Sequence, residues 1–287
     1  MEFQIIFIML CGLAFLAGAP LNSYVLFIAS SRVERTASAL LFLNRALSDL
    51  IFNFCLPLRI VFIYFLHVDW ARRLSSTITS LHMFSSAFLL TAISVHRCIL
   101  AARPEWAQKG LTASLAFWVG LLIWALSAGF SLRYGDLCEA LIPSTNTSRN
   151  FRVSPKKIKT AVAIQFLVGF LIPLALSLIP TFGIVLAARQ GRNRLIQATQ
   201  PLKILLGLIP TFFFCWLPYH VFYFLQLSAT YPPHSLERGS AFASVLTYNN
   251  SCLNPIFYLT MEEEFLRYQQ RARNPNTTDH LLLELAD

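Results

Sequence analysis

The chain contains Phe212-Phe213-Phe214-Cys215-Trp216-Leu217-Pro218-Tyr219-His220 inside a long apolar segment and, one such segment later, Asn254-Pro255-Ile256-Phe257-Tyr258. A proline inside a helix removes a backbone hydrogen bond and bends the helix. In lipid, such a bend survives only where neighbouring helices, side chains or water bond the freed carbonyl. Two bent helices with polar groups beside the bends therefore predict a helix bundle that changes shape.

Composition indicates that the bundle lies in a membrane. The chain has 287 residues, of which 56% are hydrophobic and 13% charged, and a mean hydropathy of +0.57. The charged share is about half that of an ordinary soluble domain. We ascribe the net charge of +9 to membrane topology rather than to nucleic-acid binding. The six cysteines form no CxxC pair and no His/Cys cluster, so we expect no metal site of that kind.

Apolar runs separated by polar breaks predict an all-α, seven-transmembrane bundle within residues 1–272. A short amphipathic eighth helix on the membrane surface is expected over 261–272, with Phe265 and Leu266 apolar and Glu262 to Glu264 in water. Residues 273–287 are expected to be a disordered tail, and the apolar run 3–29 is too long for a signal-peptide core. The predicted spans are 3–30, 38–66, 73–101, 111–133, 158–188, 201–228 and 239–260.

Two signals orient the predicted spans. Lys and Arg are slightly more frequent in the loops that follow the odd-numbered spans, which favours placing those loops in the cytoplasm. Asn146-Thr147-Ser148 is a glycosylation sequon in the long polar stretch 134–157, which favours placing that stretch outside. Both signals predict an N-terminus outside the cell, a cytoplasmic C-terminus and a glycan on Asn146.

With seven spans and these motifs, the chain resembles the rhodopsin-like (class A) G-protein-coupled receptors. The resemblance extends through nearly the whole chain, with at least one matching position in each span. The matching positions are Asn22, the run Leu43-Asn44-Arg45-Ala46-Leu47-Ser48-Asp49, Arg97, Trp124, Pro173, Trp216-Leu217-Pro218, Asn254 to Tyr258, and Phe265 in the eighth helix.

Within that family the chain resembles the chemoattractant branch, including formyl peptide receptors and the chemoattractant-type prostaglandin D2 receptor. The runs Arg97-Cys98, Arg103 to Gln108, Gln200 to Leu205 and Cys215 to Phe222 carry this likeness. The resemblance implies a plasma-membrane receptor, not an enzyme, for an extracellular prostanoid-like anionic lipid or a small chemoattractant peptide. It also implies a heterotrimeric G protein as partner, of the inhibitory class.

Asp49 is predicted near mid-membrane, where a carboxylate is costly unless it is paired or hydrated. We expect Ser86, Asn250, Ser251 and Asn254 around it. The resemblance implies that such a cluster binds an allosteric sodium ion, because hard oxygen ligands suit a hard cation. The alternative is a buried Asp held by hydrogen bonds to Asn and Ser.

The resemblance also implies a set of switch residues. His96 stands where the family carries an acid that pairs with Arg97, so we expect a loosened resting state and signalling without ligand, or else a receptor that no longer signals. Trp216 is expected beneath the ligand cavity, where a ring beside a proline bend can couple ligand position to helix movement; ordinary core packing is the alternative. The predicted switch residues are Arg97, Phe212, Trp216, Pro218, Asn254, Pro255 and Tyr258.

Arg59 is the predicted contact for an anionic ligand. It lies ten residues after Asp49 within an apolar run, and an intramembrane Arg is a functional candidate by default. The alternative is an Arg that extends to the membrane surface. Thr79 occupies the level where amine receptors carry Asp, so an amine ligand is not expected, and a seventh span without Lys excludes retinal. The predicted ligand-binding residues are Arg59, Thr79, Met83, Gln165, Tyr219, Tyr223 and Tyr248.

Several positions depart from the family pattern. Residues 67–97 contain no Cys, so the usual disulfide to the long outer loop is not expected and Cys138 is predicted to be a free thiol. Thr181 stands where the family carries a Tyr in the fifth span. These departures keep open a second hypothesis, a non-signalling or constitutively active decoy or divergent receptor. A transporter or channel is disfavoured because the chain has no internal repeats.

Overall fold

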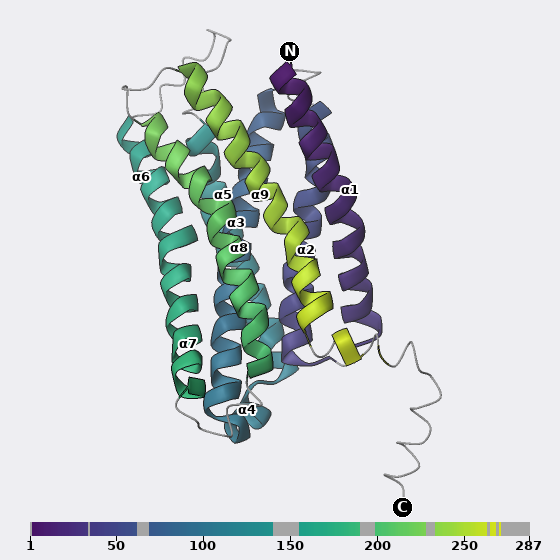
Figure 1. Cartoon of the computed structure of the whole chain (residues 1–287). Coiled ribbons are helices and arrows are strands. Elements are labelled where there is room, and N and C mark those ends of the chain that lie inside the picture. The colour runs from purple at the N-terminus through teal and green to yellow at the C-terminus, as the bar shows by residue number, and fades with distance from the viewer. Residues whose placement is uncertain are drawn as a thin grey trace, which may run out of the picture.

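The computed structural model describes residues 2–33, 35–61, 69–139, 155–189, 199–227, 233–262, 265–267 and 270. Successive long helices lie side by side and run in alternating directions (Figure 1). The elements are α1 (Glu2–Ser31), α2 (Ala37–Ile60), α3 (Asp69–Ala102), α4 (Pro104–Gly110), α5 (Ala113–Glu139), α6 (Pro155–Phe166), η2 (Leu167–Leu171), α7 (Ile172–Arg189), α8 (Thr199–Gln226) and α9 (Pro233–Met261).

The prediction of an all-helical membrane bundle is confirmed. Six helical segments in the described part of the chain are long and apolar enough to cross a membrane, the fifth of them formed by α6, η2 and α7 together. The seventh helix, α9, has 29 residues but is more polar, because it carries Asn250, Ser251 and Asn254 into the bundle interior, where all three are fully buried.

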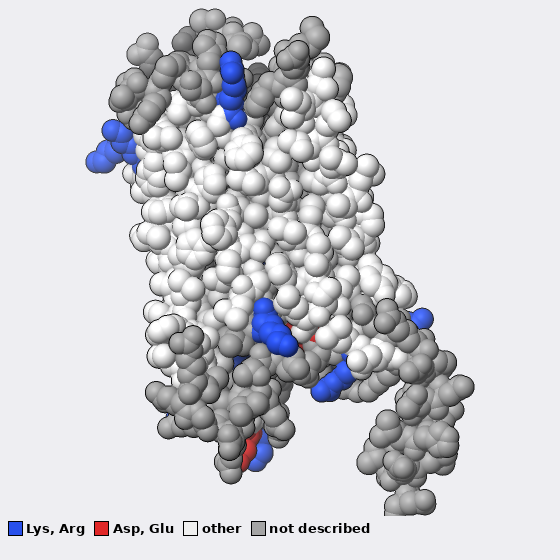
Figure 2. Space-filling view, in the orientation of Figure 1, with Lys and Arg blue, Asp and Glu red and all other residues white. Residues whose placement is uncertain are grey.

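The outer surface matches a lipid environment. Large apolar side chains such as Leu132 and Phe214, each 76% exposed, project outward from the bundle. In Figure 2 the described Lys and Arg side chains lie at the two ends of the molecule, and the band between them carries none on this face. A helix bundle that exposes apolar side chains between two charged ends can satisfy its backbone internally and bury this band in hydrocarbon.

The short helix α4 was not predicted, although the sequence encodes it. Pro104 occupies the first turn with Glu105, and Lys109 lies in the last turn, an arrangement that suits both the proline and the helix dipole. We call the end of the bundle that carries α4 the α4 end. The described part of 261–272 is too short to define the expected eighth helix, which stays a prediction, and 273–287 lies outside the described residues.

The bend at Pro255 is stabilised as the sequence predicts. Pro255 has no N–H for the carbonyl of Ser251, four residues earlier. Asn22 of α1 bonds that carbonyl, its Nδ2 donating to Ser251 O at 2.9 Å and to Gly18 O at 3.0 Å. A buried side chain of a neighbouring helix therefore satisfies the carbonyl that the proline frees, and it joins α1 to α9.

The fifth span widens just before its proline. Residues 167–171 form a π-helical turn, and the N–H of Ile172 donates to Leu167 O immediately before Pro173. Single π turns often occur at functional sites in helices. Gly169 in this turn lies against α3, since a Cβ placed there would be 2.6 Å from Met83 Cε. The turn thus allows the fifth span to approach the third at the level of the predicted ligand residue Met83.

Candidate functional site

A group of fully buried polar side chains fills the centre of the bundle, between α2, α3 and α9. We call it the central cluster. Its members each expose 2% or less of their surface. They are Arg45, Asp49, His82, Ser86, Asn250 and Asn254.

Asp49 uses both carboxylate oxygens within this cluster. Its Oδ1 lies 2.8 Å from Nε2 of His82, and its Oδ2 accepts a hydrogen bond from Nδ2 of Asn254 at 2.9 Å. A carboxylate away from water is costly unless such partners are present. Asn254 was predicted as a neighbour of Asp49, whereas His82 was not.

Arg45, one helical turn before Asp49, joins three helices. Its Nη1 donates to the backbone carbonyl of Ser86 in α3 at 2.7 Å, and its Nη2 donates to Oδ1 of Asn254 in α9 at 3.4 Å. The amide of Asn254 therefore lies between the guanidinium of Arg45 and the carboxylate of Asp49. This arrangement satisfies a cation and an anion without a direct ion pair between them.

The cluster does not fit the predicted sodium ion well. Ser251 was expected beside Asp49, but its hydroxyl donates to Tyr248 O at 2.7 Å and to Asn53 Oδ1 at 3.3 Å. Both oxygens of Asp49 are bonded to protein donors, and the oxygen of Asn254 faces Arg45. A hard cation needs several oxygen ligands. Besides the second lone pairs of the Asp49 oxygens, the cluster's side-chain oxygens without a protein partner are Ser86 Oγ and Asn250 Oδ1.

Aromatic contacts connect the central cluster to Trp216. The ring of His82 stacks on Phe52 with centroids 4.1 Å apart, and it also contacts Trp216 at 5.7 Å. Trp216 is fully buried and lies 6.3 Å from the ring of Phe212. The predicted switch tryptophan is thus in contact with the histidine that bonds Asp49.

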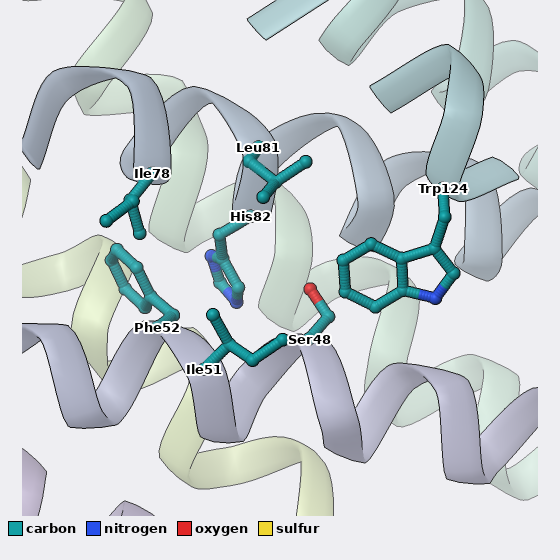
Figure 3. A pocket seen from close by; sticks show the side chains of 7 residues that line it. All are labelled: Ser48, Ile51, Phe52, Ile78, Leu81, His82 and Trp124. Carbon is teal, nitrogen blue, oxygen red and sulfur yellow. The ribbon is translucent and has the colours of Figure 1, made fainter. Parts of the chain in front are cut away.

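A narrow hollow adjoins His82 on the side of α5. Figure 3 shows the imidazole of His82 between Phe52 and Leu81, with Ser48 and Trp124 further along the hollow. Ser48 bonds Ser85 of α3, and Trp124 Nε1 donates to Asn44 Oδ1 at 3.0 Å. The residues that line the hollow are Ser48, Ile51, Phe52, Ile78, Leu81, His82 and Trp124. Of these, none was predicted to bind ligand.

The predicted ligand-binding residues lie around the same aromatic layer. Tyr219 contacts Trp216 at 5.4 Å and bonds Tyr223 through their hydroxyls at 3.2 Å. Tyr248 lies 5.4 Å from Phe52. Tyr219 and Tyr248 thus contact Trp216 and Phe52, the two rings beside His82, and ligand binding by the three tyrosines stays a prediction.

The other predicted ligand residues are buried against neighbouring helices. Gln165 donates to Ser80 Oγ at 2.9 Å, and Thr79 donates to Ser75 O at 2.8 Å. Met83 is fully buried. The side chains of Arg59 and Cys138, and the whole of Asn146, lie outside the described residues, so the predictions made for them stay predictions.

At the α4 end, Arg97 forms a buried ion pair. Its Nη2 lies 2.5 Å from Oε1 of Glu262 and donates to Ser38 Oγ at 2.8 Å. Only 9% of the Arg97 side chain and 3% of the Glu262 side chain are exposed. The prediction that Glu262 lies in water is wrong, because a nearly buried guanidinium offers its carboxylate a charged partner. The expectation that Arg97 has no restraining acid is wrong for the same reason.

Phe42 lies between this ion pair and Tyr258. The guanidinium carbon of Arg97 is 5.7 Å from the centroid of Phe42, and Phe42 contacts Tyr258 at 4.8 Å and Phe265 at 6.1 Å. Tyr258 lies one helical turn after Asn254, which bonds Asp49. Tyr258 therefore connects the central cluster with the α4 end.

Sequence reasoning missed the roles of three residues of these two sites, although each lies one helical turn from a residue that was predicted. Arg45 precedes Asp49 by four residues, His82 precedes Ser86 by four, and Glu262 follows Tyr258 by four. Residues four apart share one face of a helix. Of these, Arg45 was the plainest signal, because an intramembrane Arg is a functional candidate by default.

The fold is an all-helical membrane bundle with buried polar side chains at its centre and at its α4 end. The family model described as "7 transmembrane receptor (rhodopsin family)" matches residues 21–258. The chain belongs to this family, as its resemblance implies. Its members are receptors rather than enzymes.

Relatives place the chain in the chemoattractant branch. Chemerin-like receptor 1 of Rattus norvegicus is 31% identical over 291 residues, covering 92% of this chain and 76% of that protein. The C3a anaphylatoxin chemotactic receptor of Danio rerio is 32% identical over 274 residues (92% and 74%). Prostaglandin D2 receptor 2 of Mus musculus is 29% identical over 308 residues (98% and 78%). The chain is thus a multi-pass, chemoattractant-type class A receptor, which implies a ligand and coupling to a G protein.

Proposed function

We propose that this chain is a plasma-membrane receptor for an extracellular anionic lipid mediator or small chemoattractant peptide, and that it activates a heterotrimeric G protein of the inhibitory class. Its N-terminus lies outside the cell and the α4 end lies in the cytoplasm. The observation that carries the proposal is a set of buried contacts that runs from Tyr219 through Trp216 and His82 to Asp49 and Asn254. One helical turn after Asn254, Tyr258 contacts Phe42, which lies beside Arg97 at the α4 end.

The names of the relatives are compatible with both a lipid and a peptide ligand and do not single out one of them. Their names include chemerin, C3a and prostaglandin D2, at nearly equal identity to this chain. The basic side chain of Arg59 and the tyrosines Tyr219, Tyr223 and Tyr248 suit a ligand with an anionic group and an apolar body. Thr79 and Gln165 add polar groups on α3 and α6, and Met83 adds an apolar surface.

The pair of Arg97 and Glu262 supports a signalling receptor with a restrained resting state. At the cytoplasmic end, a G protein would have to compete for the face of the bundle where Arg97 is held. A ligand that moves Trp216 can reach this pair through His82, the central cluster and Tyr258. The path therefore links ligand binding to the release of Arg97, as a two-state switch requires.

Thr181 favours the second candidate function, a non-signalling decoy or divergent receptor. Its hydroxyl donates to Ser177 O at 2.8 Å within its own helix. The family's Tyr at this level helps to hold the active state, and Thr181 is too short for that role. A receptor that binds ligand without activating a G protein would follow.

Nucleotide exchange on purified G proteins separates the two functions. Membranes that contain the expressed chain are mixed with inhibitory-class or stimulatory-class G protein and tested with prostaglandin D2, an N-formyl peptide, C3a and chemerin. We expect one of these probes to accelerate exchange on the inhibitory class. Saturable binding of a probe without exchange on either class would instead support the decoy function, and neither binding nor exchange with confirmed surface expression would refute both.

The role of Arg59 is tested by paired ligands once a probe binds. Arg59→Ala should lower affinity for a carboxylate ligand far more than for its methyl ester, because removing one partner of a buried charge pair costs about 2–5 kcal/mol. Equal losses for both ligands would show that Arg59 acts through packing. Arg133→Ala serves as a matched control, because it removes an exposed arginine of α5 that has no predicted ligand role; it should have a small and equal effect on both ligands.

A further inference from the structure

We propose that Arg45 is the resident cation of the central cluster, so that this site excludes sodium and other monovalent cations. Arg45 is fully buried, one helical turn from Asp49, and fixed to Ser86 and Asn254. A guanidinium stays charged in proteins. It therefore balances the Asp49 carboxylate permanently, without any ion from solution.

Charge is the first argument against a bound cation. A sodium ion bound to Asp49 would share the cluster with Arg45, which is held by the same Asn254 amide that bonds Asp49. Two cations and one carboxylate would leave a net positive charge in a buried site, which is costly in a low dielectric. Without a bound ion, the positive charge of Arg45 and the negative charge of Asp49 cancel, so the cluster has no net charge when His82 is neutral.

The ligand atoms give the second argument. Both Asp49 oxygens accept bonds from His82 and Asn254, which leaves Ser86 Oγ and Asn250 Oδ1 as the cluster's side-chain oxygens without a protein partner. Several donors also lack a protein partner in the described chain: Arg45 Nε, Asn250 Nδ2 and Trp216 Nε1. A cation bound to these oxygens would share the cluster with unpaired N–H donors, whose positive ends repel it.

The proposal is tested by thermal unfolding of the full chain in lipid nanodiscs, which requires neither a ligand nor a G protein. The unfolding temperature is measured in sodium, potassium and choline chloride at equal ionic strength. For the wild-type chain we expect the same value in all three salts. A sodium-selective rise of the wild-type unfolding temperature that Asp49→Asn abolishes would overturn the proposal, and this result does not depend on any Arg45 variant being stable.

Charge variants of Arg45 sharpen the test. Arg45→Gln keeps a donor for the Ser86 carbonyl but removes the charge, so Asp49 should then recruit sodium. Its unfolding temperature should rise by about 2–5 °C for each tenfold increase in sodium above half-saturation. Arg45→Lys keeps the charge and should stay insensitive. A sodium response in Arg45→Lys equal to that of Arg45→Gln, or none in either, would show that the charge of Arg45 does not exclude the ion.

Discussion

The central cluster and the ion pair at the α4 end each combine one buried arginine with one buried carboxylate, but they are built differently. In the central cluster, Arg45 and Asp49 both belong to α2 and are bridged by the amide of Asn254. At the α4 end, Arg97 of α3 contacts Glu262 directly, just beyond the last residue of α9. The first pair is local in sequence, whereas the second joins distant segments.

This difference predicts different roles for the two sites. The central cluster lies in the middle of the bundle, where no bulk water or partner can replace a lost contact. The Arg97–Glu262 pair lies at the end of the bundle, where water or a G protein can take over either charge. A buried charge that loses its partner is costly, so the central cluster should hold the structure together, while the end pair can open and close.

The largest expected effect comes from removing one charge of the central cluster. Asp49→Leu leaves Arg45 buried without its counter-charge, which should lower the free energy of unfolding by about 3–5 kcal/mol. The double variant Asp49→Leu/Arg45→Leu removes both charges and should recover a large part of the loss. Unfolding by SDS in mixed micelles measures both variants. Additive losses in the double variant would mean that the two charges do not compensate each other.

A smaller effect, on signalling rather than on folding, is expected at the α4 end. Glu262→Gln weakens the charge-assisted bond to Arg97 by about 1–2 kcal/mol. Ligand-independent nucleotide exchange on the G protein should therefore rise about five- to thirty-fold. His96→Asp in the Glu262→Gln background supplies an acid beside Arg97 and should return exchange toward the wild-type level.

Glu105→Gln is the matched control for this prediction, because Glu105 is an exposed acid at the same end of the bundle. It should leave exchange unchanged. Equal stimulation by Glu105→Gln and Glu262→Gln would trace the effect to surface charge. If all variants match empty membranes despite surface expression, the decoy function gains support.

A neutral contact between α1 and α9 should matter less. Asn22→Ala leaves the Ser251 carbonyl without its donor and should cost about 1 kcal/mol of stability. In the Pro255→Ala background the helix regains its own N–H donor, so Asn22→Ala should cost less. This double-mutant cycle is measured by the same unfolding assay. If Asn22→Ala lowers the free energy of unfolding equally in both backgrounds, Asn22 does not stabilise the bundle by bonding the carbonyl that Pro255 frees.

The smallest effect is expected at the rim of the hollow beside the central cluster. Trp124→Phe removes the hydrogen bond to Asn44 but keeps a large ring, and it should cost about 0.5–1 kcal/mol. The outcome is read as a shift in the SDS unfolding midpoint. A loss as large as that of Asp49→Leu would mean that this rim, rather than the charges, stabilises the centre of the bundle.

The fold was predictable because membrane spans leave a strong signal. Long apolar runs predicted the helices, and the Pro255 motif predicted a bend that needs a partner, which Asn22 supplies. Asp49 was predicted because an intramembrane carboxylate is costly unless it has a role, whereas the roles of Asn254 and Trp216 were predicted from the resemblance to rhodopsin-like receptors. The short helix α4 and the π turn before Pro173 were not predicted, because such short segments show little periodicity in the spacing of their apolar residues.

The missed site residues show what a linear sequence conceals. His96 indicates that Arg97 lacks its usual acid, but no spacing rule says that Glu262, 165 residues later, replaces it. That pairing depends on how α9 ends against α3. Arg45 was visible as an intramembrane charge, yet its role depends on Asn254 lying between it and Asp49.

Hydrogen–deuterium exchange of the wild type, Glu262→Gln and Arg45→Leu in nanodiscs tests the contrast between the two sites most directly. For Glu262→Gln we predict faster exchange only near the α4 end, in peptides around Arg97 and Tyr258, with the middle of α2, α3 and α9 unchanged. For Arg45→Leu we predict faster exchange in the middle of all three helices. Faster exchange throughout the bundle in Glu262→Gln, or a change confined to one helix in Arg45→Leu, would contradict the account.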